Sequence, residues 1–117
     1  MLKILKIFIF FLSPIFANFI TDAEYAKMLY ENPRGISCAK CHGEFGEGKV
    51  IAKYKEFNKQ TGKKEIIEFK APNINSMDLQ EFARKIRDPN GVMPNYFLNN
   101  DEIITLYNYL KRVKNEK

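Results

Sequence analysis

The stretch Cys38-Ala39-Lys40-Cys41-His42 decides how this 117-residue chain is organised, because it contains both cysteines and the only histidine. On a helix, side chains three positions apart lie on one face, with their Cβ atoms about 5 to 6 Å apart. Two thiols at this spacing therefore point to the same side, and His42 follows one turn beyond Cys38. The stretch predicts a single site in which two sulfur atoms and an imidazole act together.

The spacing C-x-x-C-H is the attachment signature of a c-type haem. The two sulfurs can form thioethers with neighbouring vinyl groups at the porphyrin edge, and the imidazole then reaches the iron. A ligating histidine normally donates its second ring N–H to a carbonyl group or a similar acceptor, which fixes its tautomer. The sequence thus predicts one covalent haem c with its iron, attached to Cys38 and Cys41 and coordinated by His42.

Three other uses of such cysteines fit the sequence less well. A zinc site needs four ligands, and the chain has no further cysteine or histidine. A thioredoxin-like dithiol belongs after a strand, at the start of a helix, whereas here a helix is expected to precede the motif. A disulfide across so short a loop adds little stability, and it leaves His42 unexplained.

The first residues have the layout of a secretory signal peptide, in which a basic segment precedes an apolar segment and small residues. Lys3 and Lys6 come before the apolar residues 7–12, and Pro14 and Ala17 follow. The apolar run is shorter than the ~20 residues that cross a membrane as a helix. We therefore expect residues 1–17 to be a signal peptide of a periplasmic protein, with an uncleaved membrane anchor as the alternative.

Residues 18–117 are then expected to form one small domain. Loss of Lys3 and Lys6 lowers the formal net charge from +5 to +3, a mild basic excess that is weak support for an acidic partner, with a solvated surface as the alternative interpretation of most of the lysines. A domain of this size buries only about 65 per cent of the surface of its unfolded chain. A large apolar cofactor would therefore add substantially to the core.

The pattern of caps and apolar residues predicts a mostly α chain with one β-hairpin. Thr21 and Glu24 have the spacing of a capping box, which predicts a helix over residues 22–31. Its apolar face is expected to contain Tyr25, Met28 and Leu29. Residues 50–57 and 65–69 are rich in β-branched and aromatic residues and flank a turn at 59–63, which predicts the hairpin.

Two further helices follow the hairpin. Ser76 is expected to cap a helix over residues 77–87. A last helix begins near residues 99–102, where acidic groups suit its positive end, and extends through the basic residues 111–114. Their apolar faces are expected to contain Leu79, Phe82, Ala83 and Ile86 in the first, and Ile103, Leu106, Tyr107 and Leu110 in the second.

The sixth iron position must be filled by Met28, Met77, Met93 or a lysine, or left open. Met28 belongs to the expected core face of the first helix, and Met77 opens a helix, where packing is the commoner role. Met93 lies in the loop Gly91-Val92-Met93-Pro94, where proline keeps the backbone extended and the side chain can reach inward. A Met93 side chain that only fills a gap in the core is the remaining alternative.

With these features the chain resembles the class I single-haem c-type cytochromes. Three blocks carry the resemblance: residues 26–30 with the cysteine motif, Ala71-Pro72-Asn73-Ile74, and Met93-Pro94-Asn95-Tyr96 with the helix after it. It implies a small fold of about three helices around one haem. His42 and Met93 would be the axial ligands, and the first and last helices would cross through Leu29 or Tyr30 and Tyr109.

The chain departs from the pattern of that family in two places. No proline follows Gly43 closely enough to offer its carbonyl to His42, so Pro72 is the candidate instead, and Tyr96 is a further candidate for the haem pocket. The predicted hairpin stands where many relatives have a short loop or helix. Its aromatic residues Tyr54, Phe57 and Phe69 could cover an edge of the haem or pack only within the hairpin.

The resemblance implies electron transfer, because a histidine and a methionine close both axial positions and the thioether favours ferrous iron. We expect a monomeric, non-enzymatic carrier of a respiratory chain that meets a redox donor and acceptor with acidic docking faces, through lysines such as Lys40, Lys53 and Lys55. We expect no nucleic-acid partner, and membrane contact only through a retained N-terminal segment. The alternatives are a haem subunit of a periplasmic dehydrogenase, and an enzyme or gas sensor with open iron.

Overall fold

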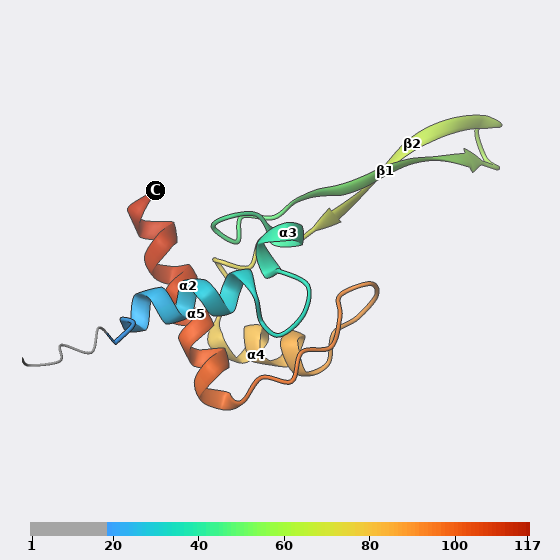
Figure 1. The fold of residues 1–117 in the computed structure, drawn as a ribbon. Helices are drawn as coiled ribbons and strands as arrows, with labels where there is room; N and C mark the ends of the chain where they lie inside the picture. Colours follow the sequence, from blue (N-terminus) through green and yellow to red (C-terminus); the bar gives the residue numbers. More distant parts are fainter. Residues whose placement is uncertain (1–18) are drawn as a thin grey trace, which may run out of the picture.

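The computed structural model describes residues 19–117, and the predicted signal peptide therefore lies outside the described residues. The elements follow in the order α2 (Asp22–Glu31), α3 (Cys38–His42), β1 (Lys49–Asn58), β2 (Lys63–Ala71), α4 (Leu79–Arg87) and α5 (Asn100–Glu116). The predicted helices and the hairpin after the cysteine motif are all present (Figure 1). None of the helices between residues 19 and 117 is long and apolar enough to cross a membrane.

Helix α2 begins with the predicted capping box. The Glu24 amide donates to Thr21 Oγ1 at 3.1 Å, and the Thr21 amide donates to Glu24 Oε2 at 2.8 Å. The predicted apolar face of α2 is partly wrong, because Met28 is 56 % exposed and Tyr25 is also exposed. The buried face instead contains Ala26, Leu29 and Tyr30, which also repeat at helical spacing. This face brings the ring of Tyr30 against Tyr109 of α5.

The core forms where α2 crosses α5, as the resemblance implied. The rings of Tyr30 and Tyr109 lie 5.7 Å apart between centroids in a tilted arrangement that suits aromatic pairs. Helix α5 contributes the largest set of buried side chains, Ile103, Leu106, Tyr109, Leu110 and Val113. Tyr107, predicted for this face, is only partly buried and packs at the edge of the core against Phe82 of α4.

Helix α4 packs on α5 through Phe82 and Ile86, two of its four predicted core residues. The prediction that Ser76 caps this helix is wrong. Asp78 is the N-cap, and its carboxylate accepts the Glu81 amide at 2.9 Å. A carboxylate at this position also interacts favourably with the positive end of the helix dipole, which explains why Asp78 takes the role. Met77 therefore precedes the helix.

Both predicted strands are confirmed, and each is slightly longer than predicted. Strands β1 and β2 pair antiparallel, with a bulge between Val50 and Ala52. The turn between them contains Gly62 at φ +69°, a conformation that suits glycine. The hairpin extends away from the helices and only its base approaches the cysteine motif (Figure 1).

Candidate haem site

Three separate segments meet around one hollow of about 340 Å³. Helix α3 supplies the cysteine motif, the end of β2 supplies the Ala71-Pro72 segment, and the loop before α5 supplies the segment around Met93. Every residue predicted for the site lines this hollow, namely Cys38, Cys41, His42, Pro72, Met93 and Tyr96. Residues far apart in the sequence thus converge as the resemblance implied.

The imidazole of His42 is buried and its orientation is fixed by one hydrogen bond. Its Nδ1 lies 2.9 Å from the carbonyl oxygen of Pro72. A carbonyl oxygen only accepts, so Nδ1 must carry the hydrogen and Nε2 is the nitrogen with a free lone pair. Pro72 therefore performs the task that a nearer proline was expected to perform, and the imidazole is prepared to bind a metal ion through Nε2.

The two thiols are free and partly buried in the wall of the hollow. Burial raises the pKa of Cys38 to about 11, so this thiol is uncharged at neutral pH. A thioether sulfur is uncharged as well, so attachment to haem at this position places no charge in the apolar wall. The residues present therefore fit a covalently attached haem.

The three candidate methionines differ clearly in position. Met28 is exposed on α2 and lines no part of the hollow. Met77 lines only a smaller, inner hollow of about 60 Å³ beside Phe82. Met93 lines both hollows, as do Cys38 and His42. The geometry therefore favours Met93 over the other two methionines.

Lys85 of α4 also lines both hollows, and sequence reasoning did not single it out. A lysine was one of the alternatives for the sixth ligand, and among the lysines of residues 19–117 only Lys85 lines both hollows. One feature of the sequence could have pointed to Lys85 as a residue near the core: it is adjacent to the predicted core residue Ile86, and it follows Arg84 in a basic run. That signal does not distinguish a lysine at a cofactor site from a lysine in water.

Tyr96 connects the Met93 loop to the segment before α3. Its hydroxyl donates to the carbonyl oxygen of Ile36 at 2.6 Å. Its ring packs so closely on Gly35 that a Cβ at that glycine would lie 3.3 Å from the ring. Burial raises the pKa of Tyr96 to about 12, so the hydroxyl keeps its hydrogen and remains a donor.

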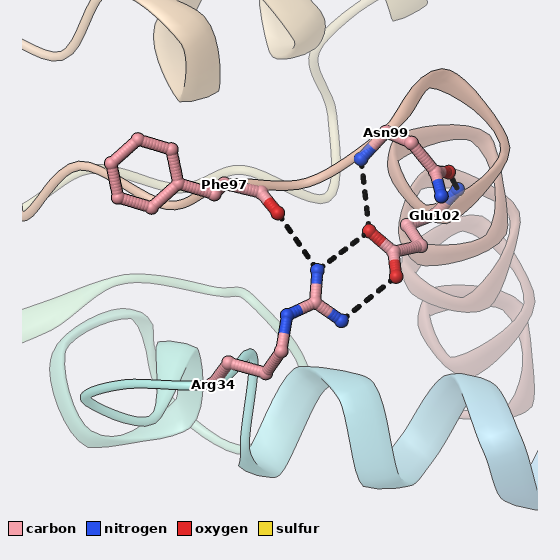
Figure 2. Close-up of polar contacts among 4 residues, drawn as sticks. All are labelled: Arg34, Phe97, Asn99 and Glu102. Atoms are coloured by element: carbon pink, nitrogen blue, oxygen red, sulfur yellow. Dashed lines mark hydrogen bonds and ion pairs between the residues drawn. The ribbon is translucent and has the colours of Figure 1, made fainter.

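A second connection holds the far end of the same loop (Figure 2). Both terminal nitrogens of Arg34 donate to the Glu102 carboxylate at 2.8 Å, and Nη2 also donates to the Phe97 carbonyl oxygen at 2.8 Å. Glu102 in turn accepts the Asn99 amide at 2.9 Å in the capping box of α5. The hydrogen bond from Arg34 holds the pKa of Glu102 below its usual value. We call these contacts the Arg34 clamp.

The helices and the hollow together define a small c-type haem protein. Residues 23–114 match the family model for cytochrome c, and the chain therefore belongs to the cytochrome c family. The resemblance to c-type cytochromes is thus confirmed, and the cofactor is covalently bound haem c with its iron. No curated protein and no solved structure matches the chain significantly.

Proposed function

We propose that the protein is an exported carrier of single electrons, with its haem attached to Cys38 and Cys41 and its iron held by His42 and Met93. The family supports haem-based electron transfer in general. The observation that carries the proposal is the hydrogen bond from His42 to Pro72, which leaves Nε2 free in a hollow that Met93 also lines. Export to the periplasm rests on the signal-peptide pattern of residues 1–17.

The residues of the hollow suit electron transfer better than catalysis. When bound, the haem supplies a one-electron couple at its iron. Met93 offers a neutral thioether, which favours the ferrous state, and His42 is held rigidly by Pro72. No carboxylate lines the hollow within the described part of the chain, so an acid-base pair for cleaving peroxide is missing there.

The assignment of Met93 is tested by absorption spectroscopy of Met93→Ala and of Met77→Ala as the matched control. The wild-type protein should show a far-red sulfur-to-iron band when oxidised and should bind carbon monoxide slowly when reduced. Met93→Ala should remove the band, bind carbon monoxide rapidly and lower the potential by on the order of 100 mV, within the ~0.8 V that axial ligands span. Met77→Ala should keep all three wild-type properties.

Two outcomes would contradict this assignment. Rapid binding of carbon monoxide by the wild-type protein would indicate open iron and favour an enzyme or a gas sensor. Loss of the band in Met77→Ala but not in Met93→Ala would show that Met77, and not Met93, is the sixth ligand. Export has its own test, because the mass of the protein from its native cells should correspond to a chain that begins at Asn18 together with one covalently attached haem.

A further inference from the structure

The positive charge of the described chain is concentrated on the hairpin. Residues 49–71 contain seven lysines and three glutamates, a formal net charge of +4. The other described residues contain ten basic and eleven acidic side chains, a net charge of −1. Glu68 is already paired with Lys53 and Lys70, and this pairing lowers its pKa. Lys55 and Lys64 form no ion pair with any residue from 19 to 117.

An apolar stripe begins at the haem hollow and continues outward along one face of the hairpin. Ile51 and Phe69 line the hollow at the base. Cross-strand partners share a face and successive residues alternate, so Tyr54 and its partner Ile67 lie on the same face as Phe69. Tyr54 is 50 % exposed. Of the two alternatives for these aromatic residues, Phe69 fits the one at the edge of the pocket, whereas Tyr54 and Phe57 do not line the hollow and are exposed.

No other described element covers this surface. Among the helices, only α3 makes an extended contact with the hairpin, at its base (Figure 1). A two-stranded hairpin is only marginally stable by itself, and exposed apolar patches of this kind usually mark sites of interaction. Phe57 and Ile66, on the opposite face, are also more than half exposed.

We propose that the hairpin is a docking arm that guides an acidic redox protein to the edge of the haem. Lys53, Lys55 and Lys64 lie on the face opposite to the stripe and attract the partner over a long range. The stripe from Tyr54 to Phe69 gives the partner an apolar contact that leads to the hollow. The proposal rests on the proposed function of electron transfer. A haem held by Cys38, Cys41 and His42 would supply a one-electron couple: the reduced protein would give one electron to an oxidised acceptor, and a reduced donor would return one electron, with no proton or atom transferred.

An anionic lipid surface would also attract lysines, but the other features favour a protein. Tyrosine is enriched among the residues that carry binding energy between proteins, and Tyr54 is half exposed. Opposite charges mainly accelerate the encounter, and salt suppresses their effect. Charge and apolar contact can therefore be tested separately by varying the salt concentration.

The charge is tested by Lys55→Glu/Lys64→Glu, with Lys27→Glu/Lys117→Glu as a control that changes the net charge equally. Stopped-flow absorption measures electron transfer between each holoprotein and a membrane and periplasmic fraction from source cells that lack the gene. At low salt the hairpin variant should react about tenfold more slowly or worse, and the difference should vanish near 1 M salt. The control should change by less than about twofold. Equal effects of the two variants would overturn the proposal.

The stripe is tested by Tyr54→Ser, with Tyr25→Ser on α2 as the matched exposed tyrosine. At high salt Tyr54→Ser should slow electron transfer about fivefold or more, because a truncated aromatic contact commonly costs more than 1 kcal/mol, and Tyr25→Ser should leave the rate unchanged. An equal rate for Tyr54→Ser and for the wild type would show that the apolar stripe does not contact the partner.

Two further measurements separate the possible failures. Voltammetry should give the same reversible one-electron couple for the wild type and all variants. If the wild type lacks that couple, the proposed function fails; if the couple is intact but the hairpin variants react like their controls, only the docking arm fails. With phosphatidylglycerol vesicles as the probe, binding that Lys55→Glu/Lys64→Glu abolishes, while its electron-transfer rate stays normal, would assign the hairpin to a lipid surface instead.

Discussion

At the scale of single residues, the contact between His42 and Pro72 depends on a glycine. Gly48 has φ +83°, and its amide donates to the His42 carbonyl oxygen at 2.7 Å. A Cβ at Gly48 would lie 2.7 Å from Ala71 O and 2.9 Å from the Pro72 carbonyl carbon. Such distances are too short for a carbon atom, so a side chain at Gly48 would have to displace the carbonyl group that orients His42.

We therefore predict that Gly48→Ala displaces the Pro72 carbonyl and loosens His42. Gly62→Ala is the matched control, because Gly62 has φ +69° but a Cβ there meets no atom within 4 Å. Gly62→Ala should cost only the strain of a left-handed alanine, roughly 1 to 2 kcal/mol of unfolding free energy. Gly48→Ala should cost about 3 kcal/mol or more and should also shift the potential of the haem. Chemical denaturation and voltammetry measure the two effects, and equal costs would show that Gly48 does not support Pro72.

Sequence reasoning found the residues of the hollow where a motif or a resemblance named them. It named Cys38 and His42 from their spacing, and Pro72 because a nearer proline was missing. It placed Met28 in the core, although Met28 is 56 % exposed, because Tyr25 and Ala26 both begin apolar patterns of helical spacing on α2. Only the packing of Tyr30 on Tyr109 decides between the two patterns, and this contact joins residues far apart in the chain.

At the scale of elements, the Met93 loop is held at one end by the Arg34 clamp (Figure 2). We predict that Arg34→Gln lets this loop move, so that Met93 leaves the iron more easily. Arg84→Gln on the exposed side of α4 is the matched control. In Arg34→Gln the reduced protein should bind carbon monoxide several-fold faster, and the far-red band should disappear at a lower temperature. Unchanged rates in both variants would mean that Tyr96 alone holds the loop.

The clamp also has a predicted dependence on pH. Arg34 lowers the pKa of Glu102 in the folded state relative to its value in the unfolded chain. The ion pair therefore contributes stability above the unfolded pKa of about 4.3, and this contribution is lost as the pH falls through the lower folded pKa. Denaturation should show Arg34→Gln to be less stable than the wild type at pH 7, and the difference should become smaller near pH 2, where only the hydrogen bond from Arg34 to the Phe97 carbonyl oxygen remains. A constant difference would indicate that Arg34 acts through packing.

The elements themselves were largely predictable because their signals are local. Each capping box, at Thr21 and at Asn99, spans only four residues of sequence. The β-branched and aromatic residues of the hairpin predict strands from the local sequence alone. The cap of α4 was misplaced because Ser76 and Asp78 are both good caps, and the side chain of Ser76 is used elsewhere, by Asn75 and Lys114. The Arg34 clamp could not be predicted, since it joins residues 68 positions apart.

At the scale of the whole molecule, the helices and the Met93 loop surround a hollow beside the core that forms where α2 crosses α5. The hollow has a volume of about 340 Å³, and most of the side chains that line it are apolar, among them Phe69, Val92 and Met93. A cofactor that covers these apolar side chains removes them from water, which stabilises the fold. Covalent haem is therefore expected to be a major part of the core, in addition to its role in electron transfer.

We accordingly predict that the domain needs its haem in order to remain folded. Cys38→Ser/Cys41→Ser should yield a chain without covalent haem, and its mass after denaturation should be that of the bare polypeptide. Circular dichroism should then show a large loss of helical signal and no cooperative melting transition at room temperature or above, because α2, α4 and the Met93 loop lose the surface on which they pack. Cys38→Ser alone keeps one thioether, so it should retain haem and melt cooperatively at a reduced temperature. A double variant free of haem that melts like the wild type would show that the crossing of α2 and α5 is sufficient as a core.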